Sequence, residues 1–157
     1  IGVSRGLGDV YKRQMYECAA ITIFLCDRHQ DAKLAPAHNS PLRSLFLQTL
    51  VYFSSSIQTA FQQDYHPYRF ADKIEDEPGA KRRGQKRLME TLQIIDDQIG
   101  ENKWILGECF SAADIYLYML TTWLKPWREH PELSNFPNVQ RIAKQTGVRP
   151  SIKLVYG

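Results

Sequence analysis

Two neighbouring residues, Glu17 and Cys18, open a predicted helix that spans Tyr16 to Arg28. The free amides and the dipole at a helix start lower the pKa of a thiol, so Cys18 could act as a nucleophile. The Glu17 carboxylate beside it opposes that effect. The alternative is structural, in which Glu17 favours the helix start and Cys18 packs as a small apolar side chain.

The other cysteines and the histidines show no spacing typical of a metal site or a catalytic group. The chain has three cysteines, an odd number without metal-ligand spacing, which indicates a reduced, cytosolic protein. We interpret Cys26 and Cys109 as packing residues. The four histidines are scattered along the chain and are expected at the surface, namely His29, His38, His66 and His130.

A basic run on a predicted helix could bind nucleic acid or another anion. It consists of Lys81, Arg82, Arg83, Lys86 and Arg87. The whole chain carries a net charge of +3, of which residues 1–14 hold +2, so the remainder carries +1. Because the domain is nearly neutral, we interpret the basic run as a solvated helix face, and we expect no nucleic-acid partner. No apolar run reaches the roughly 20 residues of a membrane span, so no membrane partner is expected either.

Beyond residue 14 the chain is predicted to be all-α, because apolar residues recur at steps of three and four. Hydrophobic residues make up 43% of the chain, which supports a packed core. Ser40-Pro41 is a typical start for a long amphipathic helix of about six turns. The other expected helices span residues 16–28, 79–100, 107–124 and 135–146.

The segments between these helices contain the turn residues. His29 to Asn39 is expected to be a linker and Asp64 to Pro78 a loop, while Arg149 to Tyr156 forms a short helix or an extended tail. Gly100 and Gly147 are expected as helix C-caps, and Gly84 weakens the helix that contains it.

A capping box is predicted where the helix within Gly107 to Leu124 begins. Ser111 is a preferred N-cap residue, and Asp114 three residues later can accept from the Ser111 amide. Phe110 and Ile115 stand where a hydrophobic staple would join them. The helix that follows is apolar almost all round, so we expect it to be buried.

The same stretch, Trp104 to Asp114 (WILGECFSAAD), resembles the segment that enters the central helix of the glutathione transferase C-terminal domain. FPNV at 136–139 and RPS at 149–151 resemble the close of that domain. YECAAI at 16–21 resembles the opening of the last helix of its thioredoxin-like N-terminal domain. The resemblance covers Met15 to Gly157. It implies a truncated thioredoxin-like domain and linker at 15–39, then a helical bundle of about five helices at 40–157.

The resemblance also implies a function. Glutathione would be the co-substrate, with Glu17 and Cys18 binding its γ-glutamyl end, and a small electrophile would be the acceptor. The implied acceptor pocket contains Tyr52, Ser56 and Trp123, with Phe53, Ser55, Tyr65 and Tyr68 as further candidates. The activating residue would lie in the missing domain, so this chain alone is expected to be inactive. The full-length parent is expected to be a cytoplasmic homodimer that conjugates or reduces electrophiles.

Two alternatives remain. The first is a non-catalytic interaction module, in which Cys18 marks a lost glutathione site. The second is a free-standing helical binding domain whose N-terminal tail is native. We favour a non-native tail, because back-translated Ser4 to Gln14 (SRGLGDVYKRQ) resembles a transposase-type sequencing adapter. Residues 1–14 are therefore expected to stand outside the fold.

Overall fold

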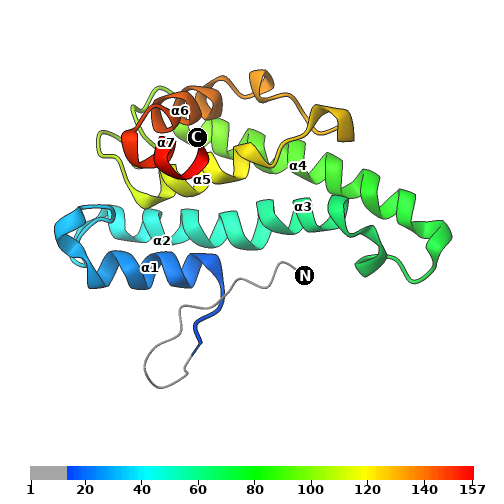
Figure 1. Ribbon diagram of the computed structural model, residues 1–157, viewed down its shortest axis with the longest axis horizontal. Coiled ribbons are helices and arrows are strands. Elements are labelled where there is room, and N and C mark those ends of the chain that lie inside the picture. Colours follow the sequence, from blue (N-terminus) through cyan, green and yellow to red (C-terminus); the bar gives the residue numbers. More distant parts are fainter. Residues whose placement is uncertain (1–13) are drawn as a thin grey trace.

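The computed structural model describes residues 14–157, and this part of the chain is helical with one isolated β-bridge between Trp104 and Gly107 (Figure 1). The proposed adapter-derived tail lies outside the described residues except for Gln14. The expected all-α class is confirmed for the described chain. The α-helices are α1 (Cys18–Arg28), α2 (Leu42–Tyr52), α3 (Gln58–Tyr65), α4 (Glu77–Ile99), α5 (Ala112–Thr122), α6 (Pro137–Gly147) and α7 (Pro150–Tyr156).

The long helix predicted from Ser40 onwards is continuous, but its middle is not α-helical. A π-helical segment, Phe53–Ile57, joins α2 to α3. Serine and threonine hydroxyls here bond to backbone carbonyls, as Ser54 Oγ donates to the Val51 carbonyl at 3.0 Å. Such bonds compete with the regular backbone hydrogen bonds of an α-helix. The spacing of the apolar residues does not reveal this competition. α1 lies along one side of the long helix, and α5 lies on the other side (Figure 1).

Gly84 lies where α3 and α4 approach most closely. A Cβ atom at this position would lie 2.8 Å from the Asp64 amide nitrogen and 3.0 Å from the Ala60 carbonyl oxygen. Both are backbone atoms that cannot move aside as a flexible side chain can. Gly84 lowers the helix propensity of α4, but its lack of a side chain permits the α3–α4 contact.

The capping box at the start of α5 is confirmed. Asp114 Oδ2 accepts from the Ser111 amide at 2.8 Å, and Ser111 Oγ accepts from the Ala113 amide at 3.2 Å. The hydrophobic staple between Phe110 and Ile115 stays a prediction. Phe110 instead packs edge-on against Trp104, with 4.9 Å between the ring centroids.

The prediction that helix α5 is buried all round is wrong. Its Leu117 and Leu120 side chains are buried in the core, but Ile115, Met119 and Trp123 are only partly buried. These three side chains line two hollows on the surface of the bundle. Apolar composition alone did not distinguish a core face from a cavity wall.

Several other expectations are corrected. His130 is buried rather than exposed, because its ring is enclosed by α3 and bonds to Asp64. Cys109 is exposed and does not pack in the core. The expected loop from Asp64 to Pro78 begins inside α3, contains two short 3₁₀ turns and ends inside α4. Gly147 is the last residue of α6, whose C-cap is Val148.

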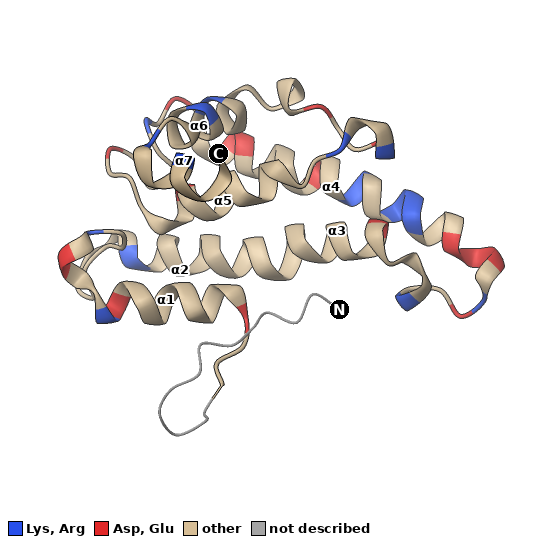
Figure 2. Ribbon diagram, in the orientation of Figure 1, with Lys and Arg blue, Asp and Glu red and all other residues tan. Residues whose placement is uncertain are grey.

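The basic run lies in the first half of α4, where Figure 2 colours Lys and Arg blue, and all of its members except the half-buried Lys81 are exposed. Lys81 Nζ lies 3.9 Å from Glu129 Oε2, and Lys86 Nζ lies 3.8 Å from Glu90 Oε1. Exposed pairs of this kind contribute at most about 1 kcal/mol each. The run is a solvated helix face that is partly balanced by nearby carboxylates.

Candidate functional site

The start of α1 combines an acidic side chain, a thiol and a strained backbone. Glu17 precedes the helix with φ 71° and ψ 117°, a conformation rare for a residue with a Cβ atom. Its carbonyl accepts from the Ile21 amide at 2.9 Å, the first bond of the helix. The amides of the first turn that follow lack intrahelical acceptors, so they are available to an anion. Backbone strain of this kind concentrates at functional sites.

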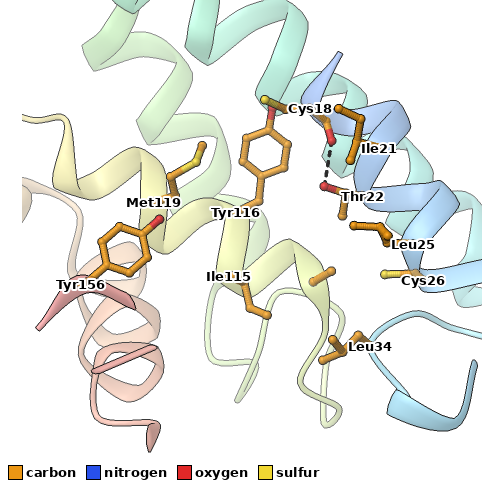
Figure 3. A pocket seen from close by; sticks show the side chains of 11 residues that line it. Cys18, Ile21, Thr22, Leu25, Cys26, Leu34, Ile115, Tyr116, Met119 and Tyr156 are labelled. Carbon is orange, nitrogen blue, oxygen red and sulfur yellow. Dashed lines mark hydrogen bonds between the residues drawn. The ribbon is translucent and has the colours of Figure 1, made fainter. Parts of the chain in front are cut away.

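Tyr116 of α5 faces this helix start. Its hydroxyl donates to Gln58 Oε1 at 2.8 Å and lies beside the Cys18 sulfur (Figure 3). Its ring meets Phe53 edge-on at 5.5 Å, which fixes its orientation. Tyr116 therefore links α1, the long helix and α5 at one point.

A cavity of about 450 Å³ extends from this point between α1 and α5 (Figure 3). No charged side chain lines it, and its polar groups are two phenols, one hydroxyl and two thiols. The lining residues are Cys18, Ile21, Thr22, Leu25, Cys26, Leu34, Ala112, Ile115, Tyr116, Met119 and Tyr156. Its volume falls in the range that accommodates a small organic molecule.

Two ionisable groups of the cavity, Tyr116 and Cys26, have a raised pKa and are held in their neutral forms. Burial raises the pKa of the Tyr116 phenol, and the neighbouring Cys18 and Glu17 raise it further. Tyr116 therefore remains a hydrogen-bond donor at neutral pH. Burial and then Asp27 raise the pKa of the Cys26 thiol, so Cys26 is not an activated nucleophile.

Two other kinds of site are absent from residues 14–157. They contain no group of three or more His, Cys, Asp or Glu side chains placed to hold a metal ion. None of their helices combines the length and the apolar character that a membrane crossing needs.

The sequence model of the family described as "Glutathione S-transferase, C-terminal domain" matches residues 78–144. Glutathione S-transferase GstA of Escherichia coli O157:H7 is 27% identical over 137 residues, which cover 87% of this chain and 64% of GstA. The chain thus spans less than two thirds of that relative.

Solved structures agree with this match. The ternary complex of BphK, a bacterial glutathione transferase, is 26% identical with a TM-score of 0.79, covering 94% of this chain and 70% of BphK. The sphingomonad glutathione S-transferase complexed with glutathione is 25% identical with a TM-score of 0.78, covering 95% and 70%. The chain is thus similar to glutathione transferases in sequence and in fold, and its residues 78–144 match the model of their C-terminal domain.

The Sulfitobacter glutathione transferase homologue has a higher TM-score of 0.85 at 19% identity, covering 96% of this chain and 79% of that protein. At this identity the likeness concerns the fold alone. The same helical arrangement therefore extends to glutathione transferases that have diverged further in sequence.

The site residues predicted from the sequence do not gather in one place. Glu17 and Cys18 lie together at the start of α1, as expected for neighbours. Tyr52 instead reaches α4, where its hydroxyl donates to the Thr91 carbonyl at 3.3 Å. Ser56 lies half-buried in the π segment, and neither it nor Tyr52 lines the α1–α5 cavity. Trp123 lines a separate groove near Tyr65.

Of the residues that line the cavity, sequence reasoning gave a binding role only to Cys18, and it missed the hydroxyl-bearing Thr22, Tyr116 and Tyr156. Tyr116 had a visible signal, since it is one of two phenols, with Tyr118, in a largely apolar helix. Its partner Gln58 lies 58 positions away, so only the fold could show their contact.

Proposed function

We propose that this chain forms the helical part of a longer enzyme that uses glutathione to conjugate or reduce a small electrophile. In conjugation, the glutathione thiol loses its proton, its sulfur bonds to the electrophilic carbon, and any leaving group departs with its electron pair. The residue that activates the thiol belongs to a thioredoxin-like domain upstream, of which α1 is the last helix. Coverage of only 64% of GstA supports this assignment.

The observation that carries the proposal is the start of α1. Its free amides suit the α-carboxylate of the γ-glutamyl group, and the Glu17 carboxylate suits the ammonium on the same carbon. The strained φ of Glu17 holds that residue at the helix start. The Cys18 thiol is a weaker donor than a hydroxyl, so its contribution to binding is small.

The α1–α5 cavity is the proposed acceptor site. It begins beside Cys18 and Tyr116, and its uncharged lining suits an apolar electrophile. The Tyr116 proton is already donated to Gln58, so at the end nearest the proposed glutathione site Tyr116 presents a hydroxyl oxygen that can accept a hydrogen bond. The expected acceptor residues Tyr52 and Ser56 lie outside this cavity, so we do not assign them to it.

The parent protein is further proposed to be a cytoplasmic homodimer. Val51 of α2 and Ile94 of α4 are 52% and 54% exposed. Val51 precedes Tyr52, and Ile94 lies three residues after Thr91. The hydrogen bond between Tyr52 and Thr91 joins the two helices. A second copy that covers these two side chains would bury exposed apolar surface. The cysteines Cys18, Cys26 and Cys109 are all free.

Binding of the complete reading frame's product to immobilised glutathione tests the proposal. We expect retention, weaker retention for Glu17→Ala, and tighter binding for Cys18→Ser by up to about 1 kcal/mol. Glu75→Ala, in an exposed loop, is the matched control and should behave as the parent. The isolated 157-residue chain should not be retained. Retention of the isolated chain, or a parent indifferent to both substitutions, would favour a non-catalytic interaction module.

A further inference from the structure

A buried histidine joins the segment between α5 and α6 to the C-terminal half of α3. The segment contains the 3₁₀ turn Pro126–Arg128, with His130 two residues after it. The side chain of His130 is fully buried, and so is that of its partner Asp64 in α3. The His130 ring also lies edge-on to Phe61 and to Tyr65, with 5.6 Å between the centroids in each pair. Burial and these aromatic neighbours screen the imidazole from solvent.

Hydrogen bonds fix the protonation state of this ring. The Lys125 amide donates to His130 Nδ1 at 3.0 Å, so this nitrogen carries no proton. The proton of the neutral ring is therefore on Nε2, which donates to Asp64 Oδ2 at 2.8 Å. A second proton, on Nδ1, would face the Lys125 N–H and remove its acceptor. The packed arrangement therefore accepts only the neutral imidazole.

The charges beside the ring also oppose a second proton. Asp64 already pairs with the Arg128 guanidinium, whose Nε donates to Asp64 Oδ2 at 3.1 Å. The three side chains are thus neutral in sum while the imidazole is neutral. Protonation of His130 would leave a net positive charge buried between α3 and the segment, and burial of an unpaired charge is costly.

Further titratable groups near these side chains do not offset such a charge. Burial raises the pKa of the Tyr65 phenol, so it carries no negative charge at neutral pH. The Glu129 carboxylate is at the surface, where it accepts from Gln85 Nε2 at 3.2 Å and lies 3.9 Å from Lys81 Nζ. Water and this cation screen the carboxylate from the buried ring.

The packed arrangement also leaves one buried acceptor unsatisfied. Asp64 Oδ1 is buried and accepts no hydrogen bond from residues 14–157. Once the segment moves away from α3, water can reach this oxygen. The hydrogen bond gained there partly compensates for those that Arg128 and His130 lose, which favours a local opening of this segment over the unfolding of the whole bundle.

We propose that the Asp64–His130 contact is a pH-sensitive switch, in which uptake of a proton by His130 releases residues 125–130 from α3. In the closed form the imidazole is neutral and buried, and in the open form it is exposed and free to be protonated. A proton that binds only the open form shifts the population towards it. Histidine ordinarily changes its charge between about pH 5 and pH 8. This switch is independent of the proposed glutathione function, because it involves neither α1 nor the α1–α5 cavity.

Amide hydrogen exchange of the ¹⁵N-labelled 157-residue chain tests the proposal. The protection factor corrects the measured rate for the pH dependence of the chemical exchange step. We expect the protection factor of the Lys125 amide to fall about tenfold between about pH 7.5 and pH 5.5, the ratio for one proton taken up by an exposed histidine. At both pH values it should stay below that of Ile95 in the core of α4, because only the segment opens.

Two outcomes of this experiment would contradict the proposal. A protection factor at Lys125 that does not change with pH would show that proton uptake and opening are not coupled. Equal protection of Lys125 and Ile95 would show that His130 is released only when the whole bundle unfolds. The histidine ring gives a direct second measurement, since long-range ¹H–¹⁵N spectra should show the Nε2–H tautomer of His130 at neutral pH. A ring that carries its proton on Nδ1 would overturn the assignment.

Substitutions separate His130 from the other titratable groups. His130→Asn places an amide oxygen near the position of Nδ1, where it can still accept from Lys125, but asparagine does not titrate. The protection factor of the Lys125 amide should then be the same at both pH values. His29→Asn, at the exposed C-cap of α1, is the matched control and should keep the full change. A pH dependence that persists in His130→Asn would assign the opening to another group, such as Asp64, and would overturn the proposal.

Discussion

Asp114 at the start of α5 accepts a hydrogen bond from the Ile105 amide, with 3.0 Å between Oδ1 and the nitrogen. Its other oxygen accepts from both the amide and the hydroxyl of Ser111, at 2.8 and 3.0 Å. One fully buried carboxylate thus closes the capping box and also holds the loop that precedes it. Burial raises the pKa of the Asp114 carboxyl, and these hydrogen bonds oppose the rise.

Asp114→Ala should lower the free energy of unfolding by about 2 kcal/mol or more, because buried donors lose their acceptor. Asp114→Asn should cost less, since it keeps one acceptor oxygen, but its NH₂ group must then face a backbone N–H. Urea unfolding monitored by circular dichroism measures both values. Equal stability of all three proteins would show that the carboxylate contributes nothing to the start of α5.

Gly84→Ala should destabilise the protein although alanine is the better helix former. The gain in helix propensity is about 1 kcal/mol, whereas overpacking against the backbone of α3 costs about 1–3 kcal/mol. Gly79→Ala in the same helix is the control, since a Cβ there meets only the flexible Arg83 side chain at 3.5 Å. Thermal unfolding should show a lower Tm for the first variant and not for the second. A higher Tm for Gly84→Ala would mean that α3 and α4 separate readily.

Glu17→Gly and Glu17→Ala should differ in stability. Both remove the carboxylate, but only glycine tolerates positive φ without a Cβ clash. The glycine variant releases the backbone strain but gains conformational entropy in its unfolded state. The net result should make it about 1 kcal/mol more stable than Glu17→Ala. Both variants should bind glutathione more weakly in the complete protein. If Glu17→Ala were the more stable variant, the backbone at this residue would be unstrained.

Ile94→Glu should convert the proposed dimer of the complete protein into a monomer, because a charge would be buried on the proposed interface face that contains Val51 and Ile94. Light scattering after gel filtration measures the mass directly. Ile74→Glu is the control, as Ile74 is 80% exposed and lies away from that face in a 3₁₀ turn. A monomeric parent, or a dimer that survives Ile94→Glu, would place the interface elsewhere or remove it.

The sequence by itself determined the local features of this protein. The helices, the Gly100 C-cap and the Ser111–Asp114 capping box depend on residues within a few positions of each other, and each is confirmed. Periodicity and capping motifs carry this information because the atoms that interact are neighbours along the chain. The family resemblance likewise rested on contiguous motifs such as that from Trp104 to Asp114.

Only the tertiary structure decided which distant residues meet. The Asp64–His130 contact joins residues 66 positions apart, and it reversed the expectation that His130 lies at the surface. Tyr116 meets Gln58 and Cys18 for the same reason, and the cavity beside them could not be inferred from any single segment. Local patterns constrain one helix at a time, whereas burial, cavities and long-range pairs depend on how the helices pack together.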